Sequence, residues 1–146
     1  MQGKFITLER AIQQARTMKG PVLFTDAADA TSSGASGDSN LIIKAVRDMG
    51  YPGRVLAQIV DEPAARAAHK AGVGAEIEVD LGGSLDPRRF PPMRVKARVK
   101  LLSDGSAKLE TMRAPLDAGP TAVPTSRSTG AVVLLSARPH LPREPR

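Results

Sequence analysis

The chain has 146 residues, a net charge of +6 and no cysteine. This length fits one domain, and a domain of about this size buries roughly 70% of the surface of its unfolded chain, so it folds without a disulfide or a structural metal. The absence of cysteine excludes a disulfide framework, a thiolate nucleophile and a zinc site with cysteine ligands.

No segment has the pattern of a membrane or export signal. The first ten residues, MQGKFITLER, lack the apolar core of a signal peptide. No run approaches the roughly 18 apolar residues that a membrane span needs. We therefore expect a soluble, cytoplasmic protein with no membrane partner.

The positive charge is concentrated in the second part of the chain. Residues 1–87 hold nine Lys and Arg against eleven Asp and Glu, whereas residues 88–146 hold twelve against four. A basic surface suits nucleic acid or another anion, but a solvated strand face followed by a basic tail is the favoured interpretation. The chain has three Phe and one Tyr, too few for a base-stacking platform. We therefore expect no nucleic-acid partner.

The first third of the chain predicts two helices with a short strand between them. Residues 7–18 carry apolar side chains at helical spacing, with Thr7 as the N-cap. Residues 22–26 begin with an apolar run too short for a helix, and we interpret them as a buried strand. Residues 39–50 return to helical spacing and end at Gly50.

The middle of the chain continues the alternation of strands and helices. Residues 54–61 predict a second strand. Residues 62–72 predict a helix that is capped by Asp61 and ended by Gly72. Residues 75–81 alternate in polarity, as a half-exposed strand does.

The last part predicts antiparallel strands. Residues 93–102 alternate apolar with basic side chains, and residues 107–112 follow a turn as the return strand of a hairpin. Residues 130–137 predict one more strand, and residues 138–146 a disordered tail rich in Pro and Arg. The expected fold is an α/β domain of residues 1–137, whose mixed sheet starts β-α-β-α-β and continues in an antiparallel hairpin region.

The loop TDAADATSSGASGDSN, residues 25–40, is the first candidate for chemistry. It follows a predicted strand and leads into a helix, and ligands of open α/β sheets bind beyond the carboxyl ends of strands. Asp26 and Asp29 could bind a metal or accept substrate hydrogen bonds. Gly34 and Gly37 permit close approach of the backbone, and free amides at the helix start could hold an anion.

A structural interpretation of the same loop stays open. Asp38 suits the N-cap of the following helix, and Asp26 and Asp29 can be ordinary loop residues. The spacing matches neither a Walker loop nor a dinucleotide fingerprint. The loop alone therefore does not decide between an active site and a capped connection.

The histidines do not complete a catalytic or metal-binding set. His140 lies in the proline-rich tail, and His69 lies near the end of a predicted helix, where the helix dipole favours its protonated form. A zinc site needs three or four ligands, and no nucleophile elbow marks a catalytic serine. A structural role is the favoured interpretation for His69.

The order of four segments resembles one known family. These segments are GPVLFTDAADATSSGASGDSN, GRVLAQIVDEPAARAAHKAGVGAEIEVDLGGSLDP, FPPMRVKARVKLLSDG and DAGPTAV. Together they are similar to the C-terminal domain of the microcystinase C-like metallopeptidases, over about residues 5–123. This sequence differs from the family pattern at residues 30–33, where many relatives have Asn-Pro-Gly, and at Ser84, where many have lysine.

The resemblance implies a function that the residues alone do not. Members of the family are zinc-dependent hydrolases of two domains, with the metal ligands in the N-terminal domain and a C-terminal domain that completes the peptide cleft. The namesake acts in microcystin degradation, on linearised fragments of a cyclic peptide. The loop residues implied to border the cleft are Asp26, Asp29, Ser33, Gly34, Gly37 and Asp38. His69 would lie behind them, as part of an H-x-A-G-V-G element.

The same resemblance sets expectations for partners and cofactors. We expect no zinc to be bound by this chain alone, and an N-terminal domain or a separate chain to supply the metal ligands. Apolar surface meant for that partner would favour association into homo-oligomers. The chain would then be a truncated reading frame, one part of a split gene or a decayed copy. The alternative function is a stand-alone module that binds an anionic small molecule.

Overall fold

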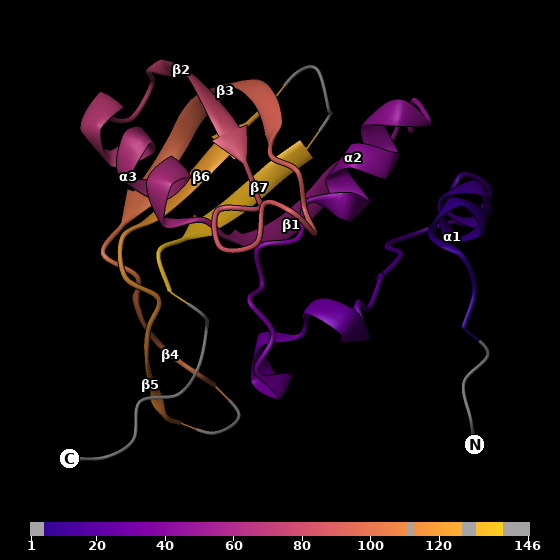
Figure 1. Ribbon diagram of the computed structural model, residues 1–146, viewed down its shortest axis with the longest axis horizontal. Coiled ribbons are helices and arrows are strands. Elements are labelled where there is room, and N and C mark those ends of the chain that lie inside the picture. Colours follow the sequence, from indigo (N-terminus) through magenta and orange to yellow (C-terminus); the bar gives the residue numbers. More distant parts are fainter. Residues whose placement is uncertain (1–4, 111–112, 127–130, 139–146) are drawn as a thin grey trace.

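A five-stranded mixed sheet forms the body of the protein in the computed structural model, which describes residues 5–110, 113–126 and 131–138 (Figure 1). The strand order is β1-β7-β6-β3-β2, and within it only β1 and β7 are parallel. The strands are β1 (Val55–Val60), β2 (Glu76–Leu81), β3 (Met93–Ser103), β6 (Thr121–Thr125) and β7 (Ala131–Ser136). The predicted mixed α/β class is confirmed.

The helices differ in how closely they join the sheet. α3 (Glu62–Ala71) lies against one face of it, as Figure 1 shows, and buries three alanines there. α2 (Leu41–Asp48) and α1 (Leu8–Ala15) lie on the other side of the molecule and contact each other. Among the described residues no helix is long and apolar enough to cross a membrane.

The core is formed by α3, the large sheet and Ile43 of α2. The small side chains of α3 let the helix approach the strands closely, and apolar residues of all five strands of the large sheet pack beneath it. The largest fully buried side chains of this cluster are Ile43, Ile59, Leu135 and Val99. α1 contributes separately, by burying Ile12 and Ala15.

The predicted strand at residues 22–26 does not form. This segment has no strand partner within the part of the chain that the structure describes, and the side chain of Leu23 is 88% exposed. Two turns of 3-10 helix follow it, at Ala27–Asp29 and Thr31–Ser33. An apolar run of three residues becomes a strand only if a sheet edge receives it, and the run itself does not encode that pairing. The expected β-α-β-α-β start therefore lacks its first strand.

The predicted hairpin of residues 93–102 with residues 107–112 is also wrong. β3 pairs with β6, while β4 (Ser106–Lys108) pairs with β5 (Pro115–Asp117) in a separate two-stranded sheet. Gly105, at φ +81°, turns the chain out of the large sheet between β3 and β4. The predicted strand at 130–137 is confirmed as β7, and residues 139–146 of the predicted tail lie outside the described residues.

The basic face of β3 lies beside an acidic face of β2. Arg94 contacts Glu78 at 3.4 Å and Asp80 at 3.2 Å. Opposite charges also face each other along the rest of the antiparallel pair, and such cross-strand pairs stabilise a sheet. The register pairs Glu76 with Arg98, Glu78 with Lys96 and Asp80 with Arg94. This arrangement favours a solvated strand face over a nucleic-acid surface for these residues.

Candidate functional site

The candidate loop is held against the ends of two strands. The carbonyl of Gly37 accepts a hydrogen bond from the amide of Val60, at the end of β1, at 2.8 Å. The carbonyl of Asp38 accepts one from the amide of Gly83, in the turn after β2, also at 2.8 Å. The end of β1 and the turn after β2 therefore both contact this loop.

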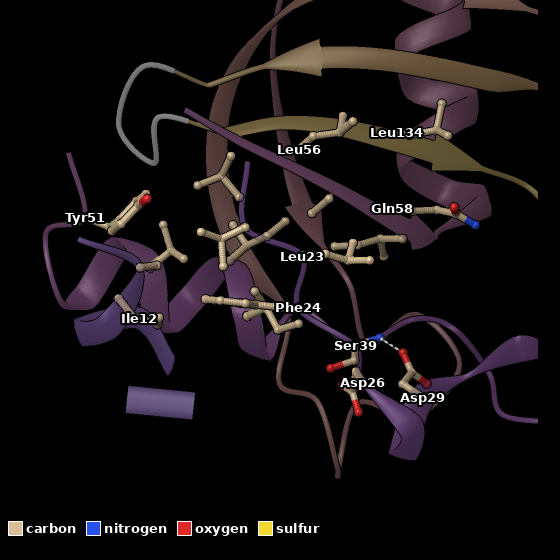
Figure 2. A pocket seen from close by; sticks show the side chains of 18 of the residues that line it. Ile12, Leu23, Phe24, Asp26, Asp29, Ser39, Tyr51, Leu56, Gln58 and Leu134 are labelled. Atoms are coloured by element: carbon tan, nitrogen blue, oxygen red, sulfur yellow. Dashed lines mark hydrogen bonds between the residues drawn. The ribbon is translucent and has the colours of Figure 1, made fainter. Parts of the chain in front are cut away.

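Asp29 organises the loop from inside. Its carboxylate accepts hydrogen bonds from the amides of Gly37 at 2.9 Å and Ser39 at 2.8 Å, the second of which is drawn in Figure 2. Asp26 accepts from the amide of Ala28 at 2.9 Å. These loop amides are satisfied by the protein's own carboxylates and are not available to an anion, whereas the anion site predicted at the start of the helix concerns the first amides of α2 and stays a prediction.

Asp38 is fully buried and is not the helix cap that its position predicts. Its carboxylate accepts from the amides of Leu85 at 2.9 Å and Asp86 at 3.0 Å, and from the hydroxyl of Ser36. The N-cap of α2 is Asn40 instead. Burial alone would raise the pKa of Asp38, but the hydrogen bonds from Ser36, Asp86 and Leu85 outweigh it and hold the pKa below its ordinary value.

We predict that Asp38 stabilises the fold at neutral pH and loses this effect in acid. Its folded-state pKa is lowered from 3.8, so its contribution is complete above that value and falls as the pH drops through the lower, folded-state value. Urea unfolding of the wild type and Asp38→Asn across the acid range measures this contribution. The difference in unfolding free energy should shrink below pH 3.8. A difference that is constant with pH would contradict the prediction.

Asp61 joins α3 to the turn after β2. One carboxylate oxygen accepts from the amide of Ala64 at 3.0 Å, as the predicted N-cap, and the other accepts from the amide of Gly82 at 2.7 Å. The residue is 1% exposed. Burial raises the pKa of Asp61, although these two hydrogen bonds oppose the shift. The bond to Gly82 was not predicted, since only the paired glycines 82–83 hinted at a close backbone approach there.

Asn40 is a site residue that the sequence did not single out. Its amide nitrogen donates to the carbonyls of Leu81 at 2.8 Å and Pro91 at 2.9 Å, while its amide oxygen is buried without a partner among the described residues. Asn40 therefore anchors the start of α2 to both ends of the turn after β2. Its place in GDSN, two residues after the predicted cap Asp38, was the available signal.

The remaining predicted residues lie at the surface or away from the loop. Ser33 and Gly34 are exposed, and Gly34 has φ +83° with open space around it. His69 donates from its Nε2 to the carbonyl of Thr121 at 3.0 Å, which ties α3 to β6. It lies about 12 Å along the helix axis from Asp61. Among the described residues no hydrogen bond or ion pair joins His69 to the loop, and its supporting role there stays a prediction.

A cleft of about 700 Å³ opens beside the loop. Its walls come from β1, α2 and residues 20–24, and they are mainly apolar. Figure 2 shows Asp26 and Asp29 at one end and Tyr51 at the other, with Leu23 and Leu56 between them. A concave apolar space with a few polar groups at its ends has the form and size of a ligand site.

The residues that border this cleft do not fit a zinc ion. Within the described part of the chain, no three His, Asp or Glu side chains gather in a group that could hold a metal. The carboxylates of Asp29 and Asp38 are already directed at backbone amides. Zinc, which prefers four ligands, has no ligand set here.

Comparison with known proteins assigns the family. A family model described as the MlrC C-terminus matches residues 24–144. Microcystinase C of Sphingomonas sp is 28% identical over 97 residues, which cover 66% of this chain and 19% of that protein. A crystal structure from Mesorhizobium sp. BNC1, named as a candidate metallopeptidase, has the same fold, with a TM-score of 0.78 and 23% identity over 94% of this chain and 28% of that one.

These matches agree with the resemblance seen in the sequence. This chain spans less than a third of the length of either relative. The family model, in contrast, covers most of the chain, including the loop, the cleft-lining strand β1 and the turn after β2. The chain belongs to the MlrC C-terminus family.

Proposed function

We propose that this chain is the C-terminal domain of a microcystinase C-like zinc metallopeptidase and forms one wall of its peptide-hydrolysing cleft. The metal ligands would lie in an N-terminal domain, on the same or on another chain. The observation that carries this proposal is the family match over residues 24–144, in a chain that covers only 19% of Microcystinase C. The peptidase names of both relatives support the reaction class.

The construction of the loop supports a role as a rigid wall. The carboxylates of Asp29 and Asp38 accept hydrogen bonds from backbone amides and so fix the position of the loop. The tip of the loop, Ser33 and Gly34, is exposed. A wall that is already formed loses little freedom when a ligand binds. These residues therefore orient the cleft, and the reacting groups would come from the partner domain.

The surface near the cleft also supports a partner domain. Leu23 is 88% exposed and Leu56 is 78% exposed, and both line the cleft. Phe5 and Met18 are exposed beside them and line a neighbouring hollow. Large exposed apolar side chains gathered in this way mark an interaction surface. Association of two copies through the same surface would explain a homo-oligomer, as expected from the sequence.

The alternative of a module for anionic small molecules has less support. The amides of Ala28, Gly37 and Ser39 already bond to Asp26 and Asp29, and these two carboxylates line the cleft, where they repel an anion. The basic residues of β3 are opposed by the acids of β2. The arrangement favours a ligand that is neutral or carries a positive group.

The proposal is tested by exchanging domains. In Microcystinase C, the region that matches this chain is replaced by residues 24–144, and hydrolysis of a linear peptide is measured with and without a chelator. We expect chelator-sensitive hydrolysis by the chimera and none by the chain alone. Gly37→Val in the chimera should remove most of the activity, because an added Cβ at Gly37 lies 2.9 Å from Val60 and 2.5 Å from Thr31.

Calorimetric titration of the isolated chain with zinc provides the matching control. We expect no one-to-one binding, and no difference between the wild type and Asp26→Asn. Tight zinc binding that Asp26→Asn abolishes, or chelator-sensitive peptide cleavage by the chain alone, would place the metal site in this chain and would contradict the proposal.

A further inference from the structure

One edge of the large sheet runs along the cleft. Among the described strands β1 is at the edge of the sheet and pairs with β7 alone. The amide of Asp61 points toward β7, since it donates to the carbonyl of Ser136 at 2.9 Å, whereas the amide of Val60 points away and donates to Gly37 at 2.8 Å. Backbone groups alternate in direction along a strand. The amides and carbonyls of Leu56 and Gln58 therefore point outward with those of Val60.

Unlike the amide of Val60, the outward amides and carbonyls of Leu56 and Gln58 have no backbone partner among the described residues. The opposite wall of the cleft, residues 22–24, lies beside β1 without forming a ladder with it. Unpaired groups along a sheet edge are a ready template for another extended chain. Here the template borders a cleft of about 700 Å³ whose walls are mainly apolar.

The two ends of this edge carry opposite charges. Arg54 immediately precedes β1, is exposed and lines the cleft, and it forms no ion pair with the described residues. Asp26 and Asp29 line the cleft at the other end (Figure 2) and likewise have no cationic partner among those residues. β1 has six residues, so the strand between these two ends is about 20 Å long, which is the length of an extended hexapeptide.

We propose that an extended peptide of about six residues adds to the edge of β1 as an antiparallel strand. Its α-amino group lies near Asp26 and Asp29, and its α-carboxylate lies near Arg54. β1 runs from Arg54 toward Val60, so this charge match determines the antiparallel direction. The peptide class of the ligand rests on the proposed function, and the mode of binding deepens it. Recognition of this kind uses main-chain bonds for affinity and side-chain pockets for selectivity.

Side-chain selectivity follows from the walls of the cleft. Alternate residues of an added strand point to the same side, and the wall on one side holds Leu23, Phe24 and Ile42. We therefore expect every second peptide residue to be apolar. The charge match favours free termini at both ends, as in a short linear peptide, over an internal segment of a folded protein.

The test is a titration of the isolated, isotope-labelled chain with the unblocked hexapeptide Val-Thr-Leu-Thr-Val-Thr, followed by amide NMR. We expect the amide signals of Leu56 and Gln58 to shift and to become protected from hydrogen exchange. The same peptide with an acetylated N-terminus and an amidated C-terminus should bind about tenfold more weakly, since each charged contact contributes a modest amount. Absence of binding by the unblocked peptide would overturn the proposal.

A matched pair of variants separates the backbone from the side chain. Gln58→Pro removes an outward amide without removing a bond to β7, and proline is tolerated at such edge positions. We expect it to weaken peptide binding at least tenfold, whereas Gln58→Ala, which keeps the amide, should change it less than threefold. A peptide N-methylated at alternate residues tests the same bonds in the wild type and should not bind, whatever the stability of the proline variant.

Two results would contradict binding of a peptide at the edge of β1. If the amides of Leu56 and Gln58 are already protected in the free chain, residues 22–26 occupy the edge themselves, and the proposal is wrong. If Gln58→Pro binds as the wild type does, the peptide uses a different surface. Neither result bears on the domain exchange with Microcystinase C, because hydrolysis by the chimera tests the assignment of the domain and not the direction of the bound peptide.

Discussion

Replacing Gly83 with alanine should destabilise the domain by about 4 kcal/mol or more, which is a large part of the total stability of a typical domain. An added Cβ at Gly83 would lie 1.7 Å from the carbonyl oxygen of Phe90, and the residue has φ +67°. The obstacle is backbone, so no side-chain rotation relieves it. The backbone at Gly83 would have to move away from Phe90, and this movement would break the hydrogen bond from the amide of Gly83 to the carbonyl of Asp38. Urea unfolding followed by circular dichroism measures the effect.

Gly34→Ala is the matched control for this prediction. Gly34 has a similar backbone angle, φ +83°, but an added Cβ there has nothing within 4 Å. We expect a loss of about 1–2 kcal/mol, the cost of the left-handed conformation alone. Equal losses for the two variants would show that the backbone angle, and not the contact with Phe90, accounts for the effect at Gly83.

Asp61→Ala should lower the free energy of unfolding by about 3 kcal/mol at neutral pH. The change leaves the buried amides of Gly82 and Ala64 without their acceptor, and an unsatisfied buried donor costs about 1–3 kcal/mol. Relief from burying a carboxylate, whose pKa is raised for that reason, offsets part of the loss. Thermal and urea unfolding of the purified variant measure the result.

Two further variants serve as controls for Asp61→Ala. Asp61→Asn keeps an oxygen that can accept from one amide, so we expect about half the loss. Glu62→Ala removes the neighbouring carboxylate, which forms an exposed pair with Arg66, and should change stability by less than about 0.5 kcal/mol. A loss for Asp61→Ala no greater than that for Glu62→Ala would contradict the role assigned to Asp61.

The parts of the fold that depend on local sequence were predicted well. α3 carries its signals within a few residues: Asp61 as the cap and Gly72 at the end were predicted and are confirmed, and a proline lies in the first turn. The alternation of β3 likewise places its basic side chains outside. The strand at 22–26 and the hairpin partner of β3 depend on which distant edge is free, and the local pattern does not contain that information.

The candidate site shows the same limit in its polar residues. The loop residues were identified because Gly and Asp cluster between two apolar runs, but their partners were not. Asp38 is of a residue type that is favoured at an N-cap, and it lies shortly before a helix. Its carboxylate instead accepts amides 47 and 48 residues further along the chain. The amides of the nearby helix and the remote amides of Leu85 and Asp86 compete for the same carboxylate, and the packing of the whole domain decides between them. The sequence spacing therefore identified Asp38 as a site residue but did not predict its hydrogen-bond partners.

The parallel pairing of β1 with β7 has a consequence for synthesis of the chain. Val55 lies opposite Ala131, 76 residues later. At a translation rate of about 5–20 residues per second, β1 leaves the ribosome about 4–15 s before its inner neighbour does. During that interval both edges of a strand containing VLAQIV are exposed. A molecular chaperone that shields this segment should raise the yield of folded protein, and synonymous codons that slow translation between β1 and β7 should lower it.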